Sequence, residues 1–318
     1  PEVFAPVFRK LKRESTKETQ FTYHAGEDFY HPLSGIRAIY EAMDFNDLGE
    51  NDRIGHATAL GIDWNLWRKE LNGEIYIRQG EWLDNLVFVY YLITKKGLTT
   101  LSELTQVLED KINILILEVY TNAIPISIYI ESWKHRKFCP ILLSYDSFED
   151  ARISPVFDME EWGEIKNVRN NPDVADVLLA YHNIDCRKRY DNIIPIESEE
   201  IIKEKQFEQV QQYVLAILAK KKIIIETLPT SNVRISHYND HSQHHVFRWL
   251  KWKEDGKSIP EIVVGADDTG IFSTNIFNEY AHIYGQLTRN NFGLANQPMN
   301  YILDLKETSE KIRFSAGT

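Results

Sequence analysis

Short apolar runs of β-prone residues recur near both ends of the chain, and each run leads into polar side chains. They predict four β-strands, at residues 20–23, 53–56, 223–226 and 261–265. Helical spacing of apolar residues follows the first strand over 33–43, and further helices are predicted over 242–254, 275–287 and 298–313. Strands that alternate with helices in this way are typical of a parallel α/β sheet.

The middle of the chain, from about residue 64 to residue 222, has helical periodicity instead. The predicted helices cover 82–95 with Gly97 as C-cap, 104–120 after a capping box at Thr100-x-x-Glu103, 125–133, 173–189 and 199–221. Residues 1–19 are charged and show no clear period, so we predict a lead-in segment there. We expect three parts: residues 1–63, a mainly helical insertion at 64–222, and residues 223–318.

Composition narrows the class of protein. The 318 residues carry a formal net charge of -11, which excludes a whole-chain basic footprint for nucleic acid. The two cysteines, Cys139 and Cys186, lie far apart and predict a reducing, cytoplasmic location with no disulfide framework. No apolar run is long enough for a transmembrane helix, so we expect no membrane partner.

The polar residues at the strand ends are of the types that bind a metal ion and move protons. The carboxyl ends of parallel strands meet at one edge of a sheet, where chemistry is usually found. His24, His56 and the pair Asp267-Asp268 offer the imidazole and carboxylate ligands that zinc takes. Glu27 follows His24 closely and could donate a proton to a substrate.

Each of these motifs also has a commoner structural explanation. A single histidine at a strand end is more often a hydrogen-bonded structural residue than a ligand. An Asp-Asp pair before Thr269-Gly270 is by itself a cap or turn signal, and residues 229–232 alone are a loop. Their occurrence together, in one order and each after a strand, is what favours a site.

In this order the motifs resemble those of the adenosine deaminase and AMP deaminase superfamily. The matching stretches are His24-Ala25-Gly26-Glu27, Arg53-Ile54-Gly55-His56, Glu226-Thr227-Leu228-Pro229-Thr230-Ser231-Asn232 and Ala266-Asp267-Asp268. Family members are (β/α)8 barrels with one catalytic zinc ion that hydrolyse the 6-amino group of adenine to give inosine and ammonia. By this resemblance the motifs end the fifth to eighth barrel strands. The implied fold is the C-terminal half of a TIM-type metallo-hydrolase barrel, interrupted by the insertion.

The resemblance also implies a role for each residue. His24 would be a zinc ligand, and Asp267 would be a second ligand and the base for the attacking water. His56 would orient that water, Glu27 would protonate purine N1, and Asp268 would bind purine N7. The substrate implied is adenosine or an adenine nucleotide.

One departure from the family changes the expected partners. Family members carry a His-x-His pair on the first strand as two more zinc ligands, and these 318 residues contain no His-x-His. We therefore expect the upstream half of the barrel to complete the zinc site, from the same polypeptide or another one. The family's Cys-Pro is Leu228-Pro229 here, and Thr269 stands where a proline is usual.

The insertion suggests assembly. A long helical insertion is similar to that expected of bacterial RADAR antiphage deaminases, which form rings or cages and act on adenosine nucleotides. Its aromatic residues indicate either a helical core or a homo-oligomer interface. Arg234, Arg248 and Lys251 could bind phosphate, or could simply be solvated surface residues.

Two other functions remain open. A non-catalytic, deaminase-like scaffold would use the insertion for assembly, although the retained Glu27, His56, Asp267 and Asp268 argue against it. An amidohydrolase could act on a different ring, but Glu27 and Asp268 as a proton donor and acceptor favour a purine.

Overall fold

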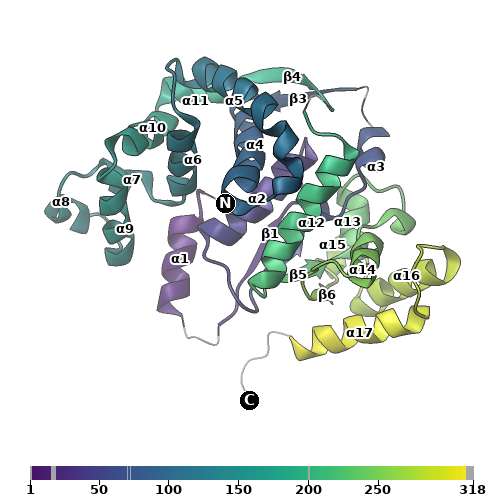
Figure 1. Cartoon of the computed structure of the whole chain (residues 1–318). Coiled ribbons are helices and arrows are strands. Elements are labelled where there is room, and N and C mark those ends of the chain that lie inside the picture. The colour runs from purple at the N-terminus through teal and green to yellow at the C-terminus, as the bar shows by residue number, and fades with distance from the viewer. Residues whose placement is uncertain (1, 16–18, 70, 72, 200, 313–318) are drawn as a thin grey trace. The chain divides into compact units, whose positions relative to one another are not determined.

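The computed structural model describes residues 2–15, 19–69, 71, 73–199 and 201–312. It divides into two compact units, each made of several chain segments (Figure 1). One unit comprises Gln20–Met43, Leu48–Gly73 and Ile202–Thr318, and the other comprises Pro1–Thr19, Asp44–Asp47 and Glu74–Ile201. We call them the sheet unit and the helical unit. None of the described helices is long and apolar enough to cross a membrane.

The sheet unit is built around four parallel strands. In sheet order these are β1 (Thr22–Ala25), β2 (Arg53–His56), β5 (Ile224–Thr227) and β6 (Ile262–Val264). The register pairs Ala25 with His56 and Gly55 with Glu226, so the carboxyl ends of these strands meet at one edge. The prediction of an α/β fold with a parallel sheet is therefore confirmed, within a mostly helical chain.

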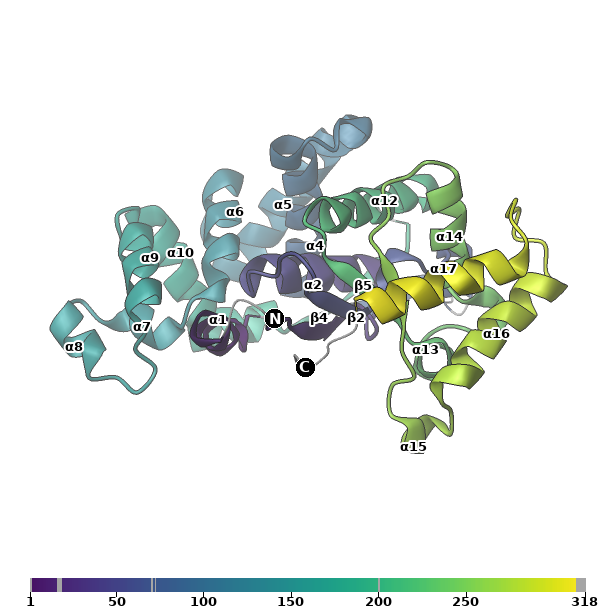
Figure 2. The same cartoon turned by 90° about the horizontal axis from the view of Figure 1, so that it is seen from below.

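The other described elements of the sheet unit are helices, most of which pack around the sheet and bury it. They are α2 (Pro32–Phe45), α3 (Trp64–Lys69), α12 (Glu204–Lys220), α13 (Pro229–Ile235), α14 (Val246–Glu254), α15 (Thr269–Phe272), α16 (Ile276–Arg289) and α17 (Pro298–Lys311), with 3-10 turns at Thr58–Leu60 and His241–Gln243. α17 packs beside β6 (Figure 1), and both views show α17 next to α16 (Figure 2). Ile54, Ile225 and the apolar face of α2 are fully buried, as expected for a parallel sheet covered by helices.

The helical unit contains α1 (Ala5–Glu14) and most of the insertion. Its other helices are α4 (Gln79–Tyr91), α5 (Thr105–Tyr120), α6 (Ile126–Lys134), α7 (Pro140–Ser144), α8 (Phe148–Arg152), α9 (Met159–Arg169), α10 (Pro172–His182) and α11 (Ile184–Tyr190), with a π turn at Leu92–Lys96 and 3-10 turns at Thr99–Leu104 and His135–Lys137. Two antiparallel strands, β3 (Glu74–Arg78) and β4 (Ile193–Glu197), pair with each other. Trp82 and Trp133 are almost completely buried, so these aromatic side chains serve the core.

Several local predictions need correction. Residues 5–14 form a helix that the sequence pattern did not reveal, and β3 and β4 lie in a region predicted to be mainly helical. The capping box is wrong, because Thr100 and Glu103 lie in a 3-10 turn and Leu104 precedes α5 without a side-chain cap. Gly97 is confirmed as a C-cap with φ of 92°.

Three of the predicted helices are also shorter than expected. The helix predicted over 173–189 breaks at Asn183, which is extended and caps α11 with its side chain. The helix predicted over 199–221 begins at Glu204, and the one predicted from 242 begins at Val246. Three predicted segments extend into residues outside the described ones. These are residues 16–18 of the lead-in, residue 200 of the helix predicted over 199–221 and residue 313 of the helix predicted over 298–313.

Candidate metal-binding site

The His-Ala-Gly-Glu motif turns sharply at the end of β1. Gly26 has a φ of +78°, a conformation that favours glycine, and the turn brings Glu27 back toward the sheet edge. His24 pairs in register with Gly55 of β2. A Cβ atom built on Gly55 would lie 2.4 Å from Cδ2 of His24 and 2.9 Å from its Nε2. The glycine of the Arg-Ile-Gly-His motif therefore leaves the space that the His24 ring occupies.

His56 ends β2 in a strained backbone conformation. Its φ is 64°, and that of Ala57 is 47°, values that non-glycine residues adopt infrequently. The ring is 2 % exposed, and its Nε2 lies 2.8 Å from Oε2 of Glu27. The rings of His24 and His56 meet edge to face with centroids 4.8 Å apart. Strain of this kind persists where surrounding contacts hold it, often at functional sites.

Asp267 joins the same edge from the end of β6. Its backbone is also left-handed, with a φ of 56°, and its Oδ2 lies 3.8 Å from Nε2 of His56. Ser231 of α13 donates a hydrogen bond to that Oδ2 at 2.5 Å. Asp268 is exposed and caps α15, where its Oδ1 accepts from the backbone of Ile271 at 2.8 Å. Asp268 therefore has the helix-capping role that an Asp-Asp pair by itself predicts.

Three of these side chains could hold a metal ion. His24, Glu27 and His56 each offer a ligand atom, and the three atoms lie within 4.8 Å of one another. Imidazole and carboxylate groups suit zinc, among other divalent metals. His24 is exposed and Glu27 partly exposed, so the group is open on one side. Asp267, the second predicted ligand, is not part of this trio but lies beside it through His56.

A buried layer behind His56 was not assigned a role from the sequence. Asn232, fully buried in α13, has its amide nitrogen 2.9 Å from Nδ1 of His56 and donates to the hydroxyl of Thr58 at 3.3 Å. Its carbonyl oxygen accepts from the backbone of Leu228 at 3.2 Å and lies 3.1 Å from Nε2 of His244. The Pro-Thr-Ser-Asn stretch, which alone was predicted to be a loop, instead begins α13, with the proline in its first turn.

Burial keeps the histidines of this layer neutral. Burial lowers the pKa of His244 to about 3 and that of His245 well below its ordinary value. His241 stacks on His282 with ring centroids 4.0 Å apart, and burial together with this neighbour lowers its pKa. His244 and His245 therefore serve as hydrogen-bonding groups rather than as charges, with Asn232 and Tyr238 as their partners.

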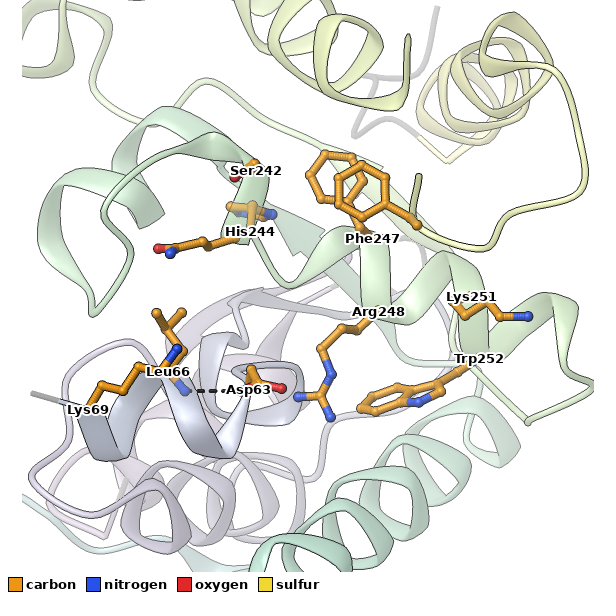
Figure 3. A pocket seen from close by; sticks show the side chains of 11 residues that line it. Asp63, Leu66, Lys69, Ser242, His244, Phe247, Arg248, Lys251 and Trp252 are labelled. Carbon is orange, nitrogen blue, oxygen red and sulfur yellow. Dashed lines mark hydrogen bonds between the residues drawn. The ribbon is translucent and has the colours of Figure 1, made fainter. Parts of the chain in front are cut away.

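A separate pocket of about 440 Å³ in the sheet unit is lined by His244 and by residues of α3 and α14 (Figure 3). Arg248 and Lys251, two of the candidate phosphate-binding residues, line it, whereas Arg234 does not. Arg248 donates to the backbone carbonyls of residues 61 and 62 and pairs with Glu208 at 3.2 Å. Lys251 pairs with Asp255 at 2.6 Å. Since carboxylates already face both cations, a structural role is favoured over phosphate binding.

Fold and site together define a class of protein: a mostly helical α/β chain with a possible metal-binding group at the carboxyl edge of a parallel sheet. The sequence matches no protein-family model and no curated protein.

Proposed function

We propose that the chain carries the chemically active half of a zinc-dependent deaminase, which hydrolyses an adenine nucleoside or nucleotide to the inosine form and ammonia. The strongest support is that the candidate catalytic side chains come together in space. Side chains from the ends of β1, β2 and β6 meet at one sheet edge, with Nε2 of His56 2.8 Å from Glu27 and 3.8 Å from Asp267. The parallel order β1-β2-β5-β6 fits four consecutive strands of a (β/α)8 barrel.

Each candidate site residue has a separate role in the proposed reaction. Glu27, at the partly exposed rim, gives a proton to purine N1 and makes C6 electrophilic. His56 orients the attacking water, Asp267 takes a proton from it, and Asp268 accepts a hydrogen bond from purine N7. After water adds at C6, the proton held by Asp267 passes to the amino group, the C6–N bond breaks and ammonia leaves. The proton of the C6 hydroxyl returns to Glu27, so both carboxyl groups regain their starting states.

The proposed metal site has its ligands at the same edge. His24 and Asp267 would hold the zinc ion, with the remaining ligands supplied by an upstream half of the barrel. When bound, zinc acts as a Lewis acid and lowers the pKa of water at its open position to about 7. Two protein ligands are fewer than the three that catalytic zinc sites use, so the upstream half is a necessary partner.

The deaminase is tested by ammonia release from adenosine, AMP and ATP, using zinc-loaded material that includes the upstream half. Glu27→Gln should lower the rate by about 10²- to 10⁴-fold, because the ring loses its proton donor. The matched control is Asp28→Asn, since Asp28 is the next residue and is exposed. The substrate with the largest kcat/KM identifies the phosphorylation state.

Two results would contradict the proposal. One is the absence of ammonia release from all three substrates although zinc is bound. The other is equal activity of the Glu27→Gln and Asp28→Asn variants. The first result favours the alternative, a deaminase-like scaffold whose insertion builds an assembly.

We further propose that the protein forms a homo-oligomer through the helical unit, in keeping with an antiphage assembly. The large aromatic side chains are buried, but apolar residues in and just before α1 are exposed, Val7 at 61 % and Val3 at 77 %. Sedimentation of the wild type beside a Val3→Asp/Val7→Asp double variant tests this. Two species of equal, monomeric mass would rule it out.

A further inference from the structure

The chain of hydrogen bonds behind His56 begins at His244. The backbone N–H of Val246 donates to Nδ1 of His244 at 3.1 Å, so this nitrogen carries a lone pair. The His244 ring is buried and neutral, because burial lowers its pKa to about 3. A neutral imidazole has one ring proton, which in His244 must therefore be on Nε2.

This proton orients the amide of Asn232. Nε2 of His244 lies 3.1 Å from Oδ1 of Asn232, and the backbone N–H of Leu228 donates to the same oxygen at 3.2 Å. Two donors face this atom, so it must be the oxygen and not the nitrogen of the amide. The NH2 group then points the other way, to Nδ1 of His56 at 2.9 Å and to the Thr58 hydroxyl at 3.3 Å.

The amide in turn decides the state of His56. A donor at 2.9 Å requires a lone pair on Nδ1, so the ring proton of neutral His56 is on Nε2, where Oε2 of Glu27 accepts it at 2.8 Å. We propose that His244 and Asn232 are positioning residues that hold His56 in its Nε2–H tautomer, so that His56 presents a hydrogen-bond donor to the site and not a metal-binding lone pair.

The Nε2–H tautomer distinguishes His56 from the other two candidate metal ligands, His24 and Glu27. Nε2 of His56 could bind a metal only if its proton moved to Nδ1, where it would face the NH2 group of Asn232. His24 and Glu27 have no such restriction, and Asp267 lies on the same side of His56. The role of His56 in orienting water rests on the proposed deaminase function. The tautomer itself does not depend on activity.

The tautomer can be read directly by long-range ¹H–¹⁵N NMR on the full chain labelled at histidine, metal-free and at about pH 8, where imidazole is neutral. A His56→Gln variant assigns the His56 signals by their loss. The expected result is an Nε2–H tautomer for His56. Asn232→Asp should move the proton to Nδ1, because a carboxylate replaces the amide donor with an acceptor.

Variants of His244 test the first link. His244→Phe removes the donor to Asn232 and should leave His56 as a mixture of tautomers, whereas His244→Gln can still donate and should restore Nε2–H. Tyr238→Phe is the matched control, since this buried hydroxyl lies beside the same imidazoles but bonds to His245, at 2.8 Å. It should leave the His56 signals unchanged.

Either of two results overturns the inference: an Nδ1–H tautomer in the wild type, or an unchanged Nε2–H tautomer in Asn232→Asp. If His244→Phe does not fold, the tautomer of His56 in the wild type and in Asn232→Asp still tests the proposal. If no ammonia is released but His56 has the Nε2–H tautomer, the deaminase function is ruled out and the positioning role of His244 and Asn232 is retained.

Discussion

At the scale of single residues, the space for His24 depends on its neighbour in β2. We predict that Gly55→Ala weakens binding of Zn²⁺ by about 10- to 100-fold, the usual effect of disturbing a group that orients a ligand. The added Cβ would lie 2.4 Å from the imidazole and force the ring to move. Titration calorimetry with Zn²⁺ or Co²⁺ measures the change.

Gly49→Ala is the control for this substitution, because nothing lies within 4 Å of the Cβ atom it would add. Equal metal affinity of the two variants would show that His24 does not bind the ion.

The buried histidines predict a loss of stability in acid. The pKa of His244 is about 3 in the folded chain and about 6.5 in the unfolded chain, so the unfolded state binds more protons between these values. The free energy of unfolding is therefore unaffected above about pH 6.5 and falls as the pH drops toward 3. At pH 5 this one group costs about 2 kcal/mol.

Urea unfolding at pH 7.5 and at pH 5 measures this effect. His244→Gln keeps a donor and lacks the titrating ring, so it should lose less stability between the two pH values than the wild type. An identical loss in both proteins would contradict the assignment.

At the scale of elements, α13 is fixed by a buried carboxylate from α16. Glu279 is fully buried, accepts from the backbone N–H of Thr230 at 2.8 Å and also accepts from the Thr274 hydroxyl. Glu279→Leu should lower the free energy of unfolding by about 2 kcal/mol, because the backbone N–H of Thr230 and the Thr274 hydroxyl lose their buried acceptor. The exposed neighbour Asn278, changed to Ala, should cost about 0.5 kcal/mol or less. Equal losses would mean that the carboxylate does not brace α13.

In the helical unit a buried ion pair joins α4 to the 3-10 turn after α6. Asp84 accepts from Arg136 at 2.5 Å, from Tyr190 at 2.5 Å and from Tyr129 at 2.8 Å. Asp84→Asn should cost about 3–5 kcal/mol, because it leaves the guanidinium buried without a counter-charge. Tyr190→Phe removes one bond and should cost about 1 kcal/mol. Thermal unfolding of both variants compares them, and a smaller loss for Asp84→Asn would refute the ion-pair argument.

The sequence predicted the strands of the sheet better than those of the helical unit. β1, β2, β5 and β6 are short apolar runs that end in polar residues, a pattern that is visible locally. β3 and β4 were missed because their alternating burial, clear in Ile75 and Ile77, lies within a region rich in helical spacing. Asn232 was noticed only as part of a motif, since its role depends on His244 and His56, which are distant in sequence.

At the scale of the whole molecule, the sequence did not reveal how segments combine into units. Residues 1–19 read as a lead-in, yet α1 belongs to the helical unit. Arg9, 3 % exposed, pairs with Glu161 at 2.8 Å and donates to the backbone carbonyl of Phe45. Contacts between residues so far apart in the chain leave no local signal, which is why composition and periodicity could not predict them.

The pairing of β3 with β4 has a consequence for how the chain folds. β2 and β5 are neighbours in the sheet, although residues 57–223 separate them in sequence, and closing so long a loop is slow and entropically unfavourable. Glu74 pairs with Glu197, so once this two-stranded ribbon forms, residues 74 and 197 of the insertion are held together. The effective loop between β2 and β5 then shrinks to the short segments outside the ribbon, and the entropic cost of joining them falls by about 1 kcal/mol. Early folding of the ribbon would thus accelerate assembly of the sheet edge on which the candidate site depends.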